Sequence, residues 1–239
     1  MNIGLAIACL ALSAALDVAA QMGSIDGVVT FRGEIPKSAV PDDAGVHRDL
    51  IEMDRNTRGI RFVVVHLSPT NAALSNSLSA VAQSSQRKPQ AKMDQQDYAF
   101  VPRVLAVREG EPVIFTNSDP ANHNVRTVSS IRTNEFNVYV GPAGKYEHRF
   151  EAQKTPVRLG CDIHPWMQGW IYVFQHPHFT VTDAKGRFHM DYLPPGEYKL
   201  VFHQPDIRYK SEQTITVSTE RSTRIELQIH DDNLPRPKE

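Results

Sequence analysis

The sequence is poor in cysteine and carries no surplus of charge. Two of its 239 residues are cysteines, Cys9 and Cys161, so at most one disulfide can form within the chain. Its 26 basic and 27 acidic residues give a formal net charge of -1, which provides no basic surface for nucleic acid or anionic lipid. We therefore expect no nucleic-acid partner. The sequence also offers no Ser-His-Asp arrangement, phosphate-binding loop or paired carboxylates, so we expect that it is not an enzyme.

Long apolar runs are missing too, except at the start. Residues 1–20 are mostly small and apolar, and Val18-Ala19-Ala20 offers small residues to signal peptidase ahead of Gln21. Asp17 interrupts the run, which is too short to span a bilayer as a stable helix. We expect a signal peptide at 1–20, export to the periplasm or the extracellular space, and no integral membrane segment after its removal. A helical N-terminal anchor is the alternative.

Loss of residues 1–20 removes Cys9 and leaves Cys161 as the single cysteine. In an exported protein a lone cysteine is a free thiol, half of an intermolecular disulfide or a metal-bound thiolate. Cys161 opens the pattern Cys161-x2-His164-x2-Met167, which brings a thiol, an imidazole and a thioether into one short loop. These neighbours favour the metal-bound thiolate.

Thiolate, imidazole and thioether are the ligands that copper prefers, and a second imidazole is available upstream at His123. We expect Cys161 to be the strong covalent ligand, His123 and His164 the imidazoles, and Met167 the long axial ligand. A loop between two strands holds such ligands nearly still while copper changes oxidation state. Asn124 is expected to hydrogen-bond across to this loop. The alternatives are a zinc ion on the Cys-His-His set, or residues that are neighbours without any metal.

The rest of the sequence indicates an all-β protein, because short β-branched runs alternate with Gly, Pro, Asn and Asp. Gly59 to Leu67 is too continuous in Val for a surface strand and predicts a buried one. Residues 70–97 are rich in Ser, Asn, Gln and Ala and predict a polar loop. The expected strands lie at 23–33, 59–67, 98–101, 104–107, 112–116, 124–128, 146–150, 155–160, 170–174, 179–190, 193–202, 214–217 and 223–229.

Four groups of residues resemble the cupredoxins, particularly plastocyanin and amicyanin. They are Phe100-x-Pro102, Gly110-x-x-Val113-x-Phe115-x-Asn117-x-Asp119, His123-Asn124-Val125 and Cys161-x-x-His164-x-x-Met167, and the resemblance covers about residues 98–175. It implies a Greek-key β-sandwich that holds one type 1 (blue) copper on His123, Cys161, His164 and Met167. It also implies a protein that carries single electrons between redox partners.

The flanking residues resemble a different family, the carboxypeptidase regulatory-like (transthyretin-like) domains. The resemblance rests on Gly27-Val28-Val29-Thr30-Phe31, Val64-Val65-His66-Leu67, Thr182-Asp183-x-x-Gly186-x-Phe188 and Leu193-Pro194-x-Gly196-x-Tyr198. We therefore expect a transthyretin-like domain in two parts, 23–69 and 177–231, with the cupredoxin domain inserted at 98–175 and a tail at 232–239. In the alternative, 59–67 is the first strand of the cupredoxin. The combination resembles exported proteins labelled for methylamine utilisation.

Two functions follow from these patterns. The first is an exported type 1 copper protein that transfers electrons through the exposed edge of His164, inside an apolar patch that includes Pro165 and Trp166. The second is a copper carrier whose attached β domain serves adhesion or assembly. Trp166 and Trp170 are expected to pack over the metal. His176 and His178 share one side of an extended chain, so they are either plain surface histidines or an accessory copper site.

Overall fold

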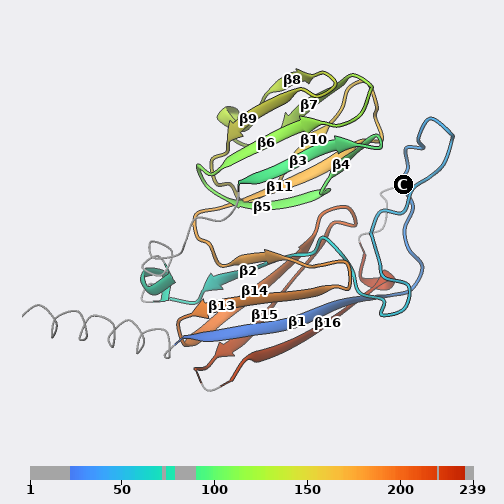
Figure 1. Ribbon diagram of the computed structural model, residues 1–239. Helices are drawn as coiled ribbons and strands as arrows, with labels where there is room; N and C mark the ends of the chain where they lie inside the picture. Colours follow the sequence, from blue (N-terminus) through green and yellow to red (C-terminus); the bar gives the residue numbers. More distant parts are fainter. Residues whose placement is uncertain (1–21, 72–73, 79–89, 220, 235–239) are drawn as a thin grey trace, which may run out of the picture.

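The structure is a computed structural model, and it describes residues 22–71, 74–78, 90–219 and 221–234. The predicted signal peptide at 1–20, part of the polar loop and the end of the tail lie outside these residues. The described chain is all-β, with two stacked bodies that we call the larger and the smaller sandwich (Figure 1). No helix among the described residues has the length and apolar character needed to cross a membrane.

The larger sandwich is built from two sheets whose strands come from both ends of the chain. Its first sheet has the order β13-β1-β16 and its second the order β12-β2-β14-β15. Its strands are β1 (Gly23–Arg32), β2 (Val64–Pro69), β12 (Phe179–Val181), β13 (Arg187–Leu193), β14 (Gly196–Gln204), β15 (Tyr209–Val217) and β16 (Thr223–His230).

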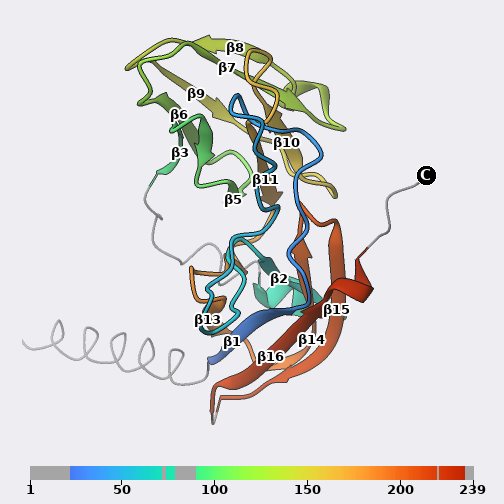
Figure 2. The ribbon, with the colours of Figure 1, turned by 90° about the vertical axis from the view of Figure 1, so that its right-hand side faces the viewer.

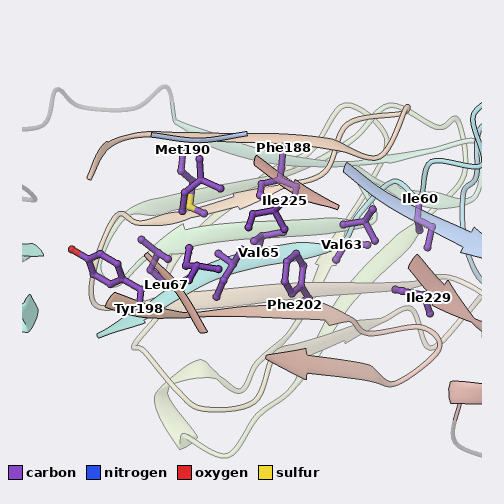
Figure 3. Packing of buried hydrophobic residues seen from close by; sticks show 14 of the residues in the cluster. Ile60, Val63, Val65, Leu67, Phe188, Met190, Tyr198, Phe202, Ile225 and Ile229 are labelled. Carbon is purple, nitrogen blue, oxygen red and sulfur yellow. The ribbon is translucent and has the colours of Figure 1, made fainter. Parts of the chain in front are cut away.

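Alternating side chains fill the space between these two sheets. Val65 and Phe202 from one sheet face Phe188 and Met190 from the other in a single buried cluster (Figure 3). Period-2 burial of this kind stabilises a sheet because every second side chain leaves water.

The smaller sandwich uses the continuous stretch 91–174, between two parts of the larger one. One sheet has the order β4-β3-β6-β9 and the other the order β5-β11-β10-β7-β8. Its strands are β3 (Ala91–Gln96), β4 (Ala99–Val101), β5 (Val104–Arg108), β6 (Pro112–Asn117), β7 (His123–Val128), β8 (Asn137–Val140), β9 (Lys145–Arg149), β10 (Val157–Gly160) and β11 (Gln168–Phe174). Short helical segments lie at 74–78, η1 (Arg132–Asn134) and η2 (Asp231–Asn233).

Two strands of the smaller sandwich differ from the sequence-based expectation. β3 falls in the stretch predicted as a polar loop, and β8 was not predicted at all. β3 pairs in parallel with β6, and its Met93 and Gln95 are fully buried. The Gln95 amide donates to the carbonyl of Thr116 at 3.3 Å, which helps to offset the cost of burying it. A polar sequence therefore forms an interior strand because its backbone pairs with β4 on one side and β6 on the other, and the buried Gln95 side chain donates one hydrogen bond to β6.

The Val-rich run at 59–67 is explained by its position between two cores. The strand itself begins at Val64 and pairs with β12 and β14, so it belongs to a sheet of the larger sandwich and not to the smaller one. Val65 and Leu67 point into the larger core, whereas Val64 packs with Val104 and Tyr172 of the smaller sandwich. Both faces are buried, which accounts for a continuous apolar sequence.

Polar contacts also join the two sandwiches. Asp206, between β14 and β15, accepts two hydrogen bonds from the Arg103 guanidinium at 3.0 and 2.7 Å. The segment after β1 rises from the larger sandwich and runs beside the smaller one (Figures 1 and 2). A cavity of ≈ 680 Å³ lies between this segment and Trp166, Gln168 and Trp170. Trp166 and Gln168, which flank the predicted ligand Met167, therefore lie at the junction between the two sandwiches.

Candidate metal centre

The predicted ligand loop is short and fixed at both ends. It joins β10 to β11, which pair antiparallel up to Gly160 opposite Gln168. The backbone N–H of Met167 donates to the carbonyl of His164 at 2.9 Å and closes a turn inside the loop. Cys161 and Met167 at its ends are 5% and 1% exposed and belong to the core of the smaller sandwich. The loop thus presents its side chains from a rigid base, as expected.

His123 reaches this loop from the start of β7, which pairs with β10. Its Nδ1 lies 2.9 Å from Nδ1 of His164, and Sγ of Cys161 lies 4.0 Å from the first nitrogen and 3.7 Å from the second. The ligand atoms of these three residues all lie within 4.8 Å of one another, and no other such group is found among the described residues. The structure therefore brings together residues that are about forty positions apart.

The donor set fits a metal ion of copper or zinc size. With metal–nitrogen bonds of about 2.0 Å and a metal–sulfur bond of about 2.3 Å, ligand atoms around one ion lie roughly 3–4 Å apart. The observed separations fall in that range. His123 is fully buried and His164 partly buried. The set of His123, Cys161, His164 and Met167 is typical of a type 1 copper site.

Asp119 fixes the proton on His123, a role that was not predicted from the sequence. Its Oδ2 lies 2.8 Å from Nε2 of His123, and since a carboxylate can only accept, Nε2 carries the proton. Nδ1 is then left with its lone pair toward Cys161 and His164. Burial opposes ionisation of Asp119, but hydrogen bonds from Tyr98 and His123 outweigh it and hold the pKa of that carboxyl below its usual range. The Asp119-x3-His123 spacing is the feature of the sequence that could have indicated this contact.

The same carboxylate anchors an aromatic side chain over the site. Oδ1 and Oδ2 of Asp119 accept the backbone N–H groups of Asp97 and Tyr98 at 2.7 and 3.0 Å. These two residues form the turn between β3 and β4 with φ of 53° and 55°. The Tyr98 ring lies edge-on to the rings of His123 and His164, with centroids 5.5 and 5.0 Å away. Asp119 therefore links a metal-facing imidazole to the turn that covers it.

The prediction that Asn124 bonds across to the ligand loop is confirmed. Its Oδ1 accepts the backbone N–H of Asp162 at 2.8 Å and the thiol of Cys161 at 3.3 Å. Its amide group donates to Asn137 and to the Asp162 carboxylate at 2.7 and 3.0 Å. Asn124 holds the loop in place, but it turns an acceptor toward the sulfur, so it does not withdraw electron density by donating to it.

The two tryptophans have different roles. Trp166 packs against His164 with ring centroids 5.3 Å apart, as expected. The expectation for Trp170 is wrong, because its indole N–H donates to Oδ1 of Asp206 at 2.9 Å in the domain junction.

Burial lowers the pKa of His164, and the neighbouring imidazole of His123 lowers it further. His176 and His178 stand outside the metal centre, and Nε2 of His178 lies 3.2 Å from the carbonyl of Leu78.

Comparisons with known proteins gave similarity at the level of structure alone. No family model and no curated protein matches the sequence. A purple cupredoxin from Nitrosopumilus maritimus is 24% identical, with 35% of this chain aligned to 99% of that one at a TM-score of 0.31. A reduced amicyanin variant is 22% identical, with 39% of this chain aligned to 90% of that one at a TM-score of 0.32. A copper-containing nitrite reductase from Thermus scotoductus is 22% identical, with 38% of this chain aligned to 23% of that one at a TM-score of 0.33.

Proposed function

We propose that this chain is a type 1 copper protein that carries single electrons, with a cupredoxin-like sandwich holding the ion. The observation that carries the proposal is the convergence of the Cys161 sulfur with Nδ1 of His123 and of His164. When bound there, copper supplies a reversible one-electron couple between its cupric and cuprous states. Met167, buried beside Cys161, is the proposed axial ligand.

The residues around this set hold it in one arrangement. Asp119 fixes His123, Asn124 fixes the start of the ligand loop, and the β10–β11 pair fixes both of its ends. A site held in this way changes little when the charge of the ion changes, which favours fast electron transfer. The rings of Tyr98 and Trp166 pack against His164 and limit the access of water.

A redox partner is proposed to dock beside His164. Three large side chains near the ligands are exposed: Tyr98 at 36%, Tyr139 at 63% and Ile163 at 53%. Ile163 precedes His164, and the Tyr139 hydroxyl donates to Asn122, next to His123. Exposed apolar groups that gather around a functional site are typical of a transient protein interface. We further propose export and a carboxypeptidase regulatory-like identity for the larger sandwich, on the sequence patterns given above.

The visible spectrum of the purified mature chain with added cupric ion tests the assignment. The expected result is an intense blue or green thiolate-to-copper band that Cys161→Ser removes. His189→Gln is the matched control, because this exposed histidine pairs with Asp26 on the larger sandwich and should leave the band unchanged. The absence of the band in the unmodified chain, or zinc retained in preference to copper, would refute the type 1 assignment.

A redox experiment separates an electron carrier from a copper carrier. The copper-loaded chain is reduced and reoxidised repeatedly, and the retained copper is measured after each cycle. An electron-transfer protein keeps its ion and recovers its full absorption band. Release of the ion on reduction would favour the copper carrier instead.

A further inference from the structure

The cavity at the junction between the sandwiches is large enough for a small organic molecule. Its volume is ≈ 680 Å³. Sites that bind such ligands usually enclose roughly 300–1,000 Å³. Its wall includes the segment at 36–40 and 48–50, residues of β10 and β11 with the loop between them, and the turn between β14 and β15. Both sandwiches therefore contribute to the lining.

Part of this lining is aromatic. The chain contains two tryptophans, and both Trp166 and Trp170 line the cavity with partly buried side chains. Leu50, Ile207 and Leu234 add aliphatic surface to the same lining. Indole rings beside aliphatic groups favour a flat apolar ligand, because its faces and the indole faces leave water together.

Two arginines of the lining have no ion pair among the described residues. Arg158 is on β10, directly opposite Trp170 on β11, so the two side chains are on the same face of the sheet. Arg208 follows Asp206 in the turn between β14 and β15. Both arginines are exposed. Because a guanidinium donates two parallel hydrogen bonds to a carboxylate, these residues favour a ligand that carries one.

The other charged groups of the lining already have partners. Five basic and three acidic side chains line the cavity. Three of the basic ones are in the ion pairs Lys37–Asp49, Arg48–Asp42 and Arg103–Asp206. The Asp231 carboxylate accepts the backbone N–H groups of Glu34 and Asp232. Arg158 and Arg208 therefore leave the lining with a surplus of positive charge, which favours an anion.

Two buried polar atoms of lining residues have no hydrogen-bond partner in the described part of the chain. Oδ1 of Asp206 accepts two hydrogen bonds from Arg103 and one from Trp170, whereas Oδ2 accepts none, although the side chain is only 2% exposed. The indole N–H of Trp166 is also buried without an acceptor. Buried polar atoms normally have partners. Small rotations of these two side chains toward the cavity expose a donor and an acceptor to a ligand.

We propose that this cavity binds a flat aromatic carboxylate that also carries a hydroxyl or amino group. Arg158 binds the carboxylate, and Arg208 adds positive charge. The ring system lies against Trp166 and Trp170, and the hydroxyl or amino group donates to Asp206. An aliphatic anion lacks the flat surface, and a neutral arene lacks the charge. The proposal does not depend on the type 1 assignment, because none of these residues is a proposed copper ligand.

Calorimetry of the purified chain with 6-hydroxy-2-naphthoate tests the proposal, because this probe has all three features. The expected result is one bound molecule per chain with a dissociation constant below about 1 mM. 2-Naphthoate lacks the hydroxyl and 2-naphthol lacks the carboxylate, so each should bind at least about fivefold more weakly. In NMR spectra the indole N–H signals of Trp166 and Trp170 should shift when 6-hydroxy-2-naphthoate is added.

Arginine variants distinguish this cavity from other binding surfaces. Arg158→Gln should lower the affinity about tenfold, since it removes the charged donors to the carboxylate. Arg132→Gln is the matched control, because Arg132 is also an exposed arginine of the smaller sandwich without an ion pair among the described residues, but it does not line the cavity. Melting temperatures of both variants check that the fold is kept.

Three results would overturn the proposal. The first is no binding of 6-hydroxy-2-naphthoate below about 1 mM, or binding that leaves both indole signals in place. The second is 2-naphthol binding as tightly as 6-hydroxy-2-naphthoate. The third is equal affinity in Arg158→Gln and Arg132→Gln. None of these results bears on the thiolate-to-copper band of the unmodified chain.

Discussion

Asp119 is the residue on which the candidate metal centre should depend most, after the ligands themselves. In Asp119→Asn the side chain keeps its shape but loses its charge and one acceptor. Three N–H donors converge on the carboxylate, from His123, Asp97 and Tyr98. A hydrogen bond to a charged group contributes about 1.5–3 kcal/mol against about 0.5–1.5 for a neutral one. In asparagine an NH2 group replaces one carboxylate oxygen, so a donor would face one of these three N–H groups where the aspartate has an acceptor.

The expected loss is about 2–4 kcal/mol in the free energy of unfolding of the metal-free chain, because Asp119 is only 6% exposed. Metal affinity should fall about 10- to 100-fold as well, because His123 no longer has a fixed proton on Nε2. Urea unfolding of the metal-free chain measures the first effect. Competition with a copper chelator measures the second.

Asp183→Asn is the matched control for this experiment. Asp183 also accepts two backbone N–H groups, from Lys185 and Arg187, and it lies on the larger sandwich with a half-exposed side chain. It should cost less than about 1 kcal/mol of stability and leave the affinity unchanged. The reasoning is refuted if Asp119→Asn binds copper as tightly as the unmodified chain, or if both variants lose affinity equally.

Three further predictions concern the larger sandwich and the junction. Gly186→Ala should destabilise the chain by more than about 2 kcal/mol in urea unfolding, because φ is 75° and a Cβ would meet the carbonyl of Val29 at 2.2 Å. Gly45→Ala, with the same φ and open space around it, should cost only about 1 kcal/mol. Asp206→Ala should cost about 2–3 kcal/mol, measured in the same way, because it leaves a largely buried arginine and an indole N–H without their acceptor. His176 and His203 have pKa values of about 4 when folded and about 6.5 when unfolded. The metal-free chain should therefore lose stability as the pH falls from about 6.5 toward 4. His203→Gln should reduce this dependence of the melting temperature on pH. An unchanged dependence in that variant would contradict the lowered pKa of His203.

The ligand loop was predictable because its information is local. Cys161, His164 and Met167 lie within seven residues, and the flanking β-branched strands fix where the loop begins and ends. Asn124 was also predictable, because its neighbour His123 had to reach the same loop. Most strands of both sandwiches followed from alternation and turn residues in the same way. The sequence alone therefore determined the chemistry of the site and the all-β class.

Only the tertiary structure decided the features that depend on partners far away in the chain. The polar strand β3 is interior because β6 pairs with it and accepts the Gln95 amide. Asp119 is a support for His123 because the turn at Asp97 and Tyr98 closes over it.

The junction shows the same dependence on distant parts of the chain. Nothing in the local sequence of His66 or His203 indicates that they meet His176. The β2–β14 register and the return of the chain from β11 bring the three rings together. Side-chain chemistry can be assigned from neighbours in sequence, but its surroundings are set by contacts between segments that are from about twenty to more than a hundred residues apart.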